Sequence, residues 1–179
     1  MPAHRHLVLM GSMGSGKTTV GRLAAAQLDR PFFDSDDDLA SMFGATASEI
    51  EDRHGIEQLH EVEADLLHRR LCASEPSVIA AAASTIEVPR CRRLLRSRAQ
   101  VAWLYVEPDV VARRIAASSW RPLVHDRSEE ELAAELLASM RSRAPALAEV
   151  ASRIVDATAL DADATVAAVL ADRRRAGAC

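Results

Sequence analysis

The sequence has few cysteines, no long apolar run and no excess of positive charge. Cys72, Cys91 and Cys179 are odd in number, far apart and without a CxxC pair, so we expect reduced thiols in a cytoplasmic protein. No apolar run approaches the roughly 20 residues that span a bilayer, and residues 1–5 contain no apolar leader. The net charge of −4 argues against a dedicated nucleic-acid binder, which would need a basic surface. These absences favour a protein that acts on small molecules, without membrane or nucleic-acid partners.

Lysine is almost missing from the chain. Lys17 is the only lysine, and every other basic residue among the 22 Lys and Arg is arginine. A bias that replaced lysine elsewhere has left it here, and a compact ammonium group is not interchangeable with a planar guanidinium. The position of Lys17 therefore indicates a functional requirement.

Lys17 lies in the segment Gly11–Thr18, whose sequence GSMGSGKT has the spacing of a P-loop. A short apolar run, Leu7–Met10, precedes it and a predicted helix over Thr19–Leu28 follows, which is the strand, loop and helix order that the motif requires. Glycines let several backbone N–H groups point at one anion, and the helix dipole adds positive potential there. The predicted nucleotide-binding residues of this segment are Gly11, Ser12, Met13, Gly14, Ser15, Gly16, Lys17, Thr18 and Thr19.

Strand-like apolar segments alternate with helical ones along the whole chain. This order favours a three-layer α/β/α domain with a parallel sheet, and 179 residues suit one domain, 1–179. Among the helices, we expect one over Leu39–Phe43, one over Ile56–Leu71 with Ile56 on its buried side, and a basic, solvated one over Pro89–Arg98. A helix from Ser128 is expected to end at Met140.

Acidic residues follow the second predicted strand, in the run Asp34-Ser35-Asp36-Asp37-Asp38. Carboxyl ends of parallel strands are where ligands bind in such sheets. Asp37 and Asp38 fit a helix N-terminus, whereas Asp34 and Asp36, one residue apart on extended chain, are expected to point the same way. We predict that Asp34, with the Thr18 hydroxyl, holds Mg²⁺ and that Asp36 accepts a hydrogen bond from a substrate hydroxyl.

The P-loop, the Asp-x-Asp at the second strand, Arg121-Pro122-Leu123 and Arg143-Ala144-Pro145 together resemble the shikimate kinase family, whose members are P-loop kinases of the nucleoside-monophosphate-kinase-like fold. The resemblance implies phosphorylation of a small-molecule hydroxyl by ATP and Mg²⁺, in aromatic amino acid biosynthesis, by a monomer. It implies an acceptor-binding region at about 36–75 and assigns Arg114 to the adenine. Residues 118–127 lack regular periodicity and carry arginines, so we expect a mobile lid there, with Arg121 at the transferred phosphate.

The predicted acceptor site departs from that family at two places. The family has Phe-Arg where this chain has Leu59-His60, and a neutral imidazole does not form the bidentate, charged fork that arginine gives a carboxylate. The family also has three glycines where this chain has Ala82-Ala83-Ser84, so added Cβ atoms narrow the pocket. The resemblance further implies that Glu63 and Arg143 contact the acceptor. The predicted acceptor-binding residues are thus Asp36, His60, Glu63, Ala82, Ala83, Ser84 and Arg143.

Several functions remain open at this point. A kinase for another polyol or cyclitol acid shares all these features, and a non-catalytic nucleotide-binding protein would keep the P-loop alone. A chain with one lysine has no Asn-Lys-x-Asp guanine motif, which disfavours a regulatory GTPase. A nucleoside monophosphate kinase is disfavoured because Asp36 would repel a phosphate-bearing acceptor.

Overall fold

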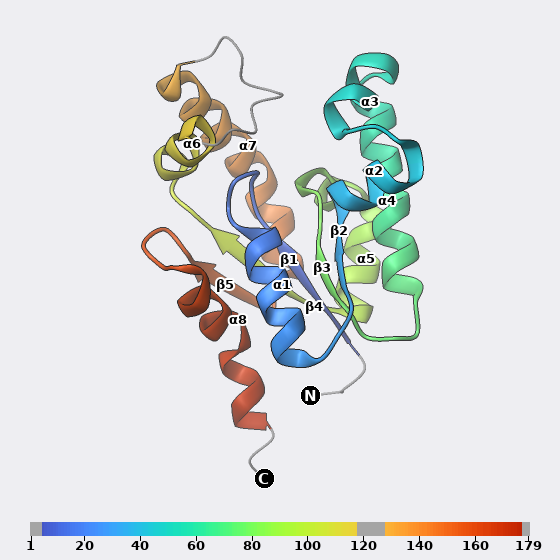
Figure 1. Ribbon diagram of the computed structural model, residues 1–179, viewed down its shortest axis with the longest axis vertical. Helices are drawn as coiled ribbons and strands as arrows, with labels where there is room; N and C mark the ends of the chain where they lie inside the picture. The colour runs from blue at the N-terminus through green and yellow to red at the C-terminus, as the bar shows by residue number, and fades with distance from the viewer. Residues whose placement is uncertain (1–4, 118–127, 177–179) are drawn as a thin grey trace.

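The computed structural model describes residues 5–117 and 128–176. They form a five-stranded parallel sheet with helices around it (Figure 1). The strand order is β2-β3-β1-β4-β5, so β1 lies at the centre with β3 and β4 on either side. The strands are β1 (His6–Met10), β2 (Phe32–Asp34), β3 (Val78–Ala80), β4 (Ala99–Tyr105) and β5 (Arg153–Asp156).

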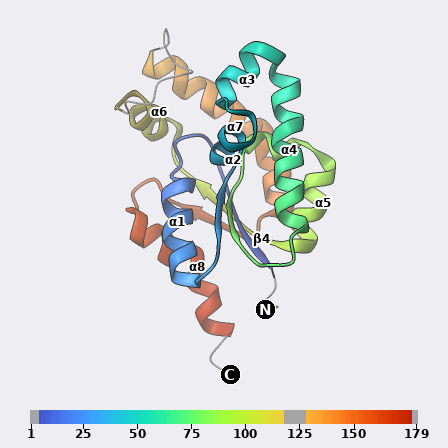
Figure 2. The same cartoon turned by 45° about the vertical axis from the view of Figure 1, so that its right-hand side comes forward.

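Helices cover both faces of this sheet, as Figures 1 and 2 show from two directions. They are α1 (Lys17–Leu28), α2 (Ser35–Phe43), α3 (Ala47–His54), α4 (Ile56–Cys72), α5 (Pro89–Arg98), α6 (Pro108–Ala117), α7 (Glu129–Val150) and α8 (Ala162–Ala176), with a 3₁₀ helix η1 (Ala83–Glu87) after β3. Helices α1 and α8 pack on one face, whereas α4, α5 and the end of α7 pack on the other. The three-layer α/β/α fold is therefore confirmed.

The central strand shows why the sheet needs both layers. Leu7 and Leu9 belong to the core under α1 and α8, while Val8 and Met10 belong to the core under α4 and α5. Alternate side chains of a strand point to opposite faces of the sheet, so a continuous apolar run is buried only when helices cover both faces.

Two helices differ from the expectation. Helix α2 begins at Ser35 rather than Leu39, because Asp34 is its N-cap and accepts a hydrogen bond from the Asp36 N–H at 3.0 Å. Helix α7 continues past Met140 to Val150 with Pro145 inside it. Burial of Leu147 and Val150 after the proline compensates for the lost backbone hydrogen bond.

Helices α2, α3 and α4 share a small core of their own, which contains Leu39, Ala45, Ile50, Leu59 and Leu66. Ile56 is not part of it: its side chain is exposed, contrary to the expectation, because it stands in the first turn of α4 directly after Gly55.

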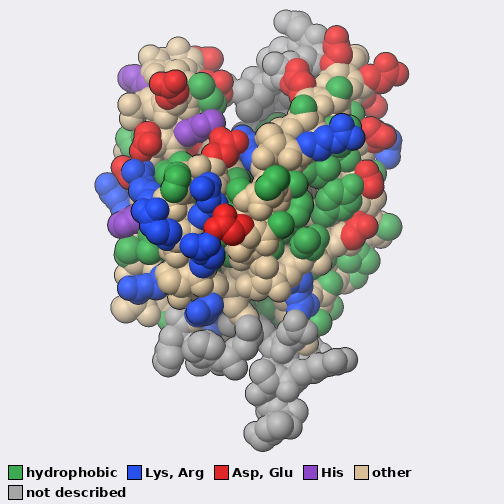
Figure 3. Space-filling model, turned by 180° about the vertical axis from the view of Figure 1, so that it is seen from behind, with side chains coloured by type: hydrophobic (Ala, Val, Ile, Leu, Met, Phe, Trp, Pro, Cys, Tyr) green, Lys and Arg blue, Asp and Glu red, His purple; other side chains and the backbone are tan. Residues whose placement is uncertain are grey.

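The arginines of α5 form ion pairs that hold it between its neighbours. Arg90 contacts Glu61 and Asp65 of α4, and Arg96 contacts Glu149 of α7. Figure 3, which views the molecule from behind, shows basic side chains, all of them arginines here, gathered over this region. The helix is basic and partly solvated as expected, and three of its arginines, Arg90, Arg92 and Arg96, are paired with acidic residues of α4 and α7.

Cys72 and Cys91 are free thiols. Within 5–117 and 128–176, no helix has the length and apolarity needed to cross a membrane.

Candidate active site

The loop between β1 and α1 has a backbone that only glycine adopts at its two ends. Gly16 precedes α1 with a φ of 91°, in the left-handed region. Gly11 has a φ of 151°, and a Cβ there would lie 2.5 Å from the Leu104 carbonyl oxygen. The loop is thereby curled against the end of β4, and its last turn leads into the N-terminus of α1.

Lys17 lies over this loop. Its ammonium donates hydrogen bonds to the carbonyl oxygens of Gly11 at 3.0 Å and Ser12 at 2.9 Å. Burial lowers the pKa of Lys17, while the carboxylates of Asp36, Asp34 and Glu63 act in the opposite direction. An ammonium has three N–H donors, so one is left for a ligand.

Thr18 and Asp34 meet as the sequence predicted: Thr18 Oγ1 donates a hydrogen bond to Asp34 Oδ2 at 2.7 Å. Asp34 is buried, and its other oxygen accepts the Asp36 N–H. Asp36, however, is in the first turn of α2. The expectation that Asp34 and Asp36 lie on extended chain and point the same way for that reason is therefore wrong. Burial and the charge of Asp34 raise the pKa of Asp36, and Lys17 opposes this shift.

Glu63 and Ser84, two of the predicted acceptor-binding residues, are in contact. Both side chains are buried, and the Ser84 hydroxyl donates a hydrogen bond to Glu63 Oε2. Burial raises the pKa of Glu63, the bond from Ser84 lowers it, and the charges of Asp36 and Arg143 act in opposite directions. Asp36, Glu63 and Arg143 therefore belong to one electrostatic cluster.

The turn after β3 holds its non-glycine residues without strain. Ala82 has φ −61° and ψ 139°, which any residue adopts. Its N–H donates to Ser35 Oγ at 3.0 Å, and that hydroxyl in turn donates to the Ala80 carbonyl oxygen. The Ala82-Ala83-Ser84 turn is thus fixed to the start of α2, next to Asp34 and Asp36.

Arg143 lies within α7, which continues past its expected end at Met140. Its Nε donates to Glu87 Oε1 at 2.9 Å and its Nη1 to Ser139 Oγ at 2.7 Å. His60 is half-buried on α4, three residues before Glu63 and so on a neighbouring part of the same helical surface.

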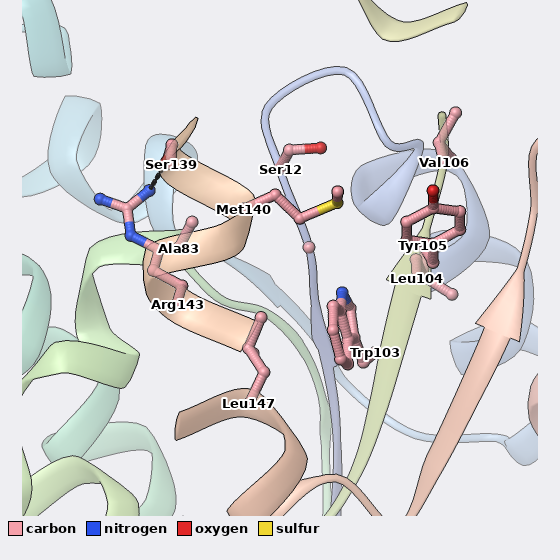
Figure 4. Close-up of a pocket in the computed structure, with 11 residues that line it drawn as sticks. Ser12, Ala83, Trp103, Leu104, Tyr105, Val106, Ser139, Met140, Arg143 and Leu147 are labelled. Carbon is pink, nitrogen blue, oxygen red and sulfur yellow. Dashed lines mark hydrogen bonds between the residues drawn. The ribbon is translucent and has the colours of Figure 1, made fainter. Parts of the chain in front are cut away.

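A cavity runs between the P-loop, the end of β4 and α7 (Figure 4). Its lining residues are Gly11, Ser12, Ala83, Trp103, Leu104, Tyr105, Val106, Ser139, Met140, Arg143 and Leu147. Figure 4 shows Met140 and Leu147 of α7 on one side of it and Trp103 of β4 on the other. The guanidinium of Arg143 points away from them, toward Ser139. The cavity joins predicted loop residues to predicted acceptor residues.

Sequence reasoning missed the contributions of Trp103, Tyr105 and Met140 to this cavity. Trp103 and Tyr105 belong to β4, and the last residues of this strand stand at the carboxyl edge of a parallel sheet. That position is the signal in the sequence that could have found them.

Three of the other predicted nucleotide-binding residues, Met13, Thr19 and Arg114, do not line this cavity. Thr19 is exposed in the first turn of α1, and Arg114 is exposed on α6. Met13 packs against the small core that α6 forms with α7. Arg121 and the predicted lid 118–127 lie outside the described residues.

A glycine loop between the central strand and a helix, with a hydroxyl–carboxylate pair at its end, is the phosphate-binding arrangement of P-loop proteins. A family model described as shikimate kinase matches residues 13–173. The chain belongs to the shikimate kinase family.

Individual relatives agree with this assignment. A shikimate kinase of Rhizobium meliloti is 34% identical over 176 residues, which cover 96% of this chain and 88% of the relative. The crystal structure of the Bacteroides thetaiotaomicron shikimate kinase has a TM-score of 0.87 and 25% identity, with 96% of this chain and 99% of that chain covered. The Acinetobacter baumannii shikimate kinase in complex with shikimate has a TM-score of 0.86 and 26% identity, covering 99% of this chain and 97% of that one.

Proposed function

We propose that the chain transfers the γ-phosphoryl group of ATP to a hydroxyl of a small polyhydroxylated acceptor, and that shikimate is the first acceptor to test. The observation that carries this proposal is the Thr18–Asp34 hydrogen bond, which joins the P-loop to the acidic run beside Asp36. Membership of the shikimate kinase family supports it.

The loop fits a nucleotide phosphate. Among the described residues, Ser15 Oγ is a buried side-chain oxygen without a hydrogen-bond partner, and it lies in the loop itself. Buried polar atoms are normally satisfied, so this one supports binding of a ligand there. The loop N–H groups and Lys17 would bind the phosphates, and Arg114 would contact the base.

The Thr18 hydroxyl and the Asp34 carboxylate fit Mg²⁺, which prefers oxygen ligands. When bound, the metal supplies positive charge next to the phosphates. Asp36 would orient the acceptor hydroxyl and receive its proton, and Arg121 would contact the transferred group. Glu63, Ser84, His60, Ala82, Ala83 and Arg143 would shape the acceptor site. The monomeric state and cytoplasmic location expected from the sequence remain predictions.

A coupled assay of ADP release tests the proposal, with ³¹P NMR to identify the phosphorylated product. We expect Mg²⁺-dependent turnover with shikimate or with a polyol of a cyclitol panel. Nucleotide binding without product formation from any acceptor would instead identify a non-catalytic nucleotide-binding protein.

A further inference from the structure

The 3₁₀ helix η1 is bonded to both of the long helices that carry predicted acceptor-binding residues. Near its start, Ser84 donates a hydrogen bond to Glu63 of α4. At its last residue, Glu87 Oε1 accepts a hydrogen bond from Arg143 Nε of α7 at 2.9 Å. One short element after β3 therefore sets where side chains of α4 and of α7 stand.

The end of η1 that carries Glu87 is itself held in place. Arg92 of α5 donates hydrogen bonds from Nη1 to the carbonyl oxygens of Ile86 at 2.8 Å and Glu87 at 3.0 Å. The same arginine pairs with Glu149 of α7 at 3.5 Å. The backbone of Glu87 is thereby fixed relative to α7, so its carboxylate defines a position for the Arg143 side chain.

Two contacts fix the guanidinium of Arg143 and leave part of it available. Its Nε is bonded to Glu87 and its Nη1 to Ser139, one turn earlier on α7, so the plane of the group is set. A guanidinium has five N–H donors, of which these bonds use two. Among the described residues, no side chain or carbonyl accepts a hydrogen bond from Nη2. The donors that remain suffice for a bidentate pair with a carboxylate.

Arg143 also stands beside the phosphate-binding loop. It lines the cavity of Figure 4 together with Gly11 and Ser12 of the P-loop and Ala83 of η1. Among the predicted acceptor-binding residues it is the only arginine. The orientation of this one guanidinium therefore matters for any acidic acceptor bound next to the loop.

From these contacts, and resting on the kinase function proposed above, we infer that Glu87 is a positioning residue for acceptor binding. Its carboxylate holds Arg143 so that the unbonded N–H groups face a carboxylate of the acceptor, and Glu87 itself does not touch the acceptor. Without this partner the long Arg143 side chain would sample several rotamers, and the acceptor would have to order it on binding. Loss of the Glu87 side chain should therefore weaken acceptor binding and leave nucleotide binding unchanged.

The test measures shikimate Kd by calorimetry, with a non-hydrolysable ATP analogue and Mg²⁺ present, and KM and kcat by ADP release. Glu87→Ala should raise Kd and KM for shikimate about tenfold, with kcat and nucleotide Kd within about twofold of wild type. Glu87→Gln keeps an oxygen that accepts the Nε–H, so its Kd should stay within about threefold of wild type. A role in stability alone would not separate acceptor binding from kcat and nucleotide binding in this way.

Two results would overturn the inference. An unchanged shikimate Kd in Glu87→Ala would mean that Arg143 needs no partner. A lower Kd in both Glu87 variants would mean that Glu87 competes with the acceptor for Arg143 instead of positioning it. Ser139→Ala removes the other contact of the guanidinium and should raise Kd in the same direction as Glu87→Ala.

A double-mutant cycle tests whether Glu87 acts through Arg143. In an Arg143→Ala background, Glu87→Ala should change kcat/KM for shikimate less than about twofold, and an undiminished effect would overturn the assignment. Glu61→Ala is the matched control, because Glu61 is an exposed carboxylate of α4 that pairs with Arg90 at 2.8 Å. Its shikimate Kd should equal that of wild type.

The same measurements separate this inference from the kinase proposal. If the wild type phosphorylates only neutral acceptors, the inference is overturned and the kinase proposal stands. If it binds shikimate but phosphorylates no acceptor, the kinase proposal fails, and the Kd series still decides the role of Glu87. Nucleotide binding without acceptor binding or turnover would overturn both.

Discussion

Thr18 and Asp34 are sixteen residues apart in the chain and are joined by a 2.7 Å hydrogen bond from Thr18 Oγ1 to Asp34 Oδ2. Thr18 is in the first turn of α1, and Asp34 is both the last residue of β2 and the N-cap of α2. One carboxylate thus fixes the start of α2 and faces the end of the P-loop. This contact links the P-loop to the acidic run that carries the proposed acceptor-binding residue Asp36.

Replacing Lys17 by alanine should abolish phosphoryl transfer and leave the fold intact. Lys17 contacts two loop carbonyls and packs into no apolar core, so thermal unfolding should change little. Loss of a group that stabilises developing charge typically lowers kcat about 10²–10³-fold. The ADP-release assay measures this, with a circular dichroism melt as the folding control. Turnover of the variant within threefold of wild type would contradict the kinase proposal.

The two aspartates should differ in their effects. Asp34→Asn should raise the Mg²⁺ concentration needed for half-maximal rate, while stability changes little because asparagine also caps helices. Asp36→Asn should lower kcat with nucleotide Kd nearly unchanged. Magnesium titrations of the rate and nucleotide titrations by calorimetry separate the two. If both variants only lower the melting temperature, the residues serve α2 alone.

The meeting of Thr18 with Asp34 could be predicted because it depends on features near each residue in sequence. A P-loop fixes the place of its last hydroxyl, and the carboxyl ends of parallel strands share one edge of the sheet. The buried strands and the cap of α7 at Ser128 follow from equally local patterns.

The Glu63–Ser84 bond could not be predicted in this way. The two residues are on different elements, and their contact depends on how α4 packs over η1. Arg143 shows the same limit. The helix that carries it continues past the expected end at Met140, because burial of Leu147 and Val150, about 1.5–3 kcal/mol for each side chain, outweighs a cost of about 3 kcal/mol for the internal Pro145.

His6 should make stability depend on pH. It is buried, its Nδ1 accepts the Ser77 N–H at 3.2 Å, and its Nε2 lies 3.3 Å from the Ala73 carbonyl oxygen, an arrangement that suits the neutral ring. Burial lowers the pKa of His6 below the ordinary 6.5. A lowered pKa means that the folded state binds its proton less readily than the unfolded state. The His6 contribution is therefore present above about pH 6.5 and is lost as pH falls toward the folded-state pKa.

Urea unfolding of the wild type and of His6→Asn between pH 5 and pH 8 measures this contribution. The difference in unfolding free energy between the two proteins should be constant above pH 7 and should shrink below pH 6.5. His68→Asn, which changes an exposed histidine of α4, is the control and should give a nearly flat difference. A His6→Asn difference that grows on acidification would reverse the sign and refute this account.

Arg70 should tune the acceptor site through the placement of α2. Its Nε and Nη2 donate to the two oxygens of Asp38 at 2.9 and 2.6 Å, and its guanidinium carbon lies 3.5 Å from the centre of the Phe33 ring. Lysine cannot reproduce this fork or its stacking, so Arg70→Lys should lose one hydrogen bond to a charged group, about 1.5–3 kcal/mol. For a chain of this size that lowers Tm by roughly 3–12 °C.

The same change loosens the connection between α4, which carries Glu63, and α2, which carries Asp36. We therefore expect KM for the acceptor to rise severalfold, while the nucleotide Kd stays within twofold because the P-loop is not touched. Arg69→Lys is the matched control, because Arg69 is the neighbouring arginine and is exposed on α4. If Arg69→Lys and Arg70→Lys alter Tm and KM equally, the Arg70–Asp38 pair has no special part in positioning the acceptor. If instead Arg70→Lys weakens nucleotide binding as much as acceptor binding, α2 is coupled to the P-loop through Asp34 rather than to α4.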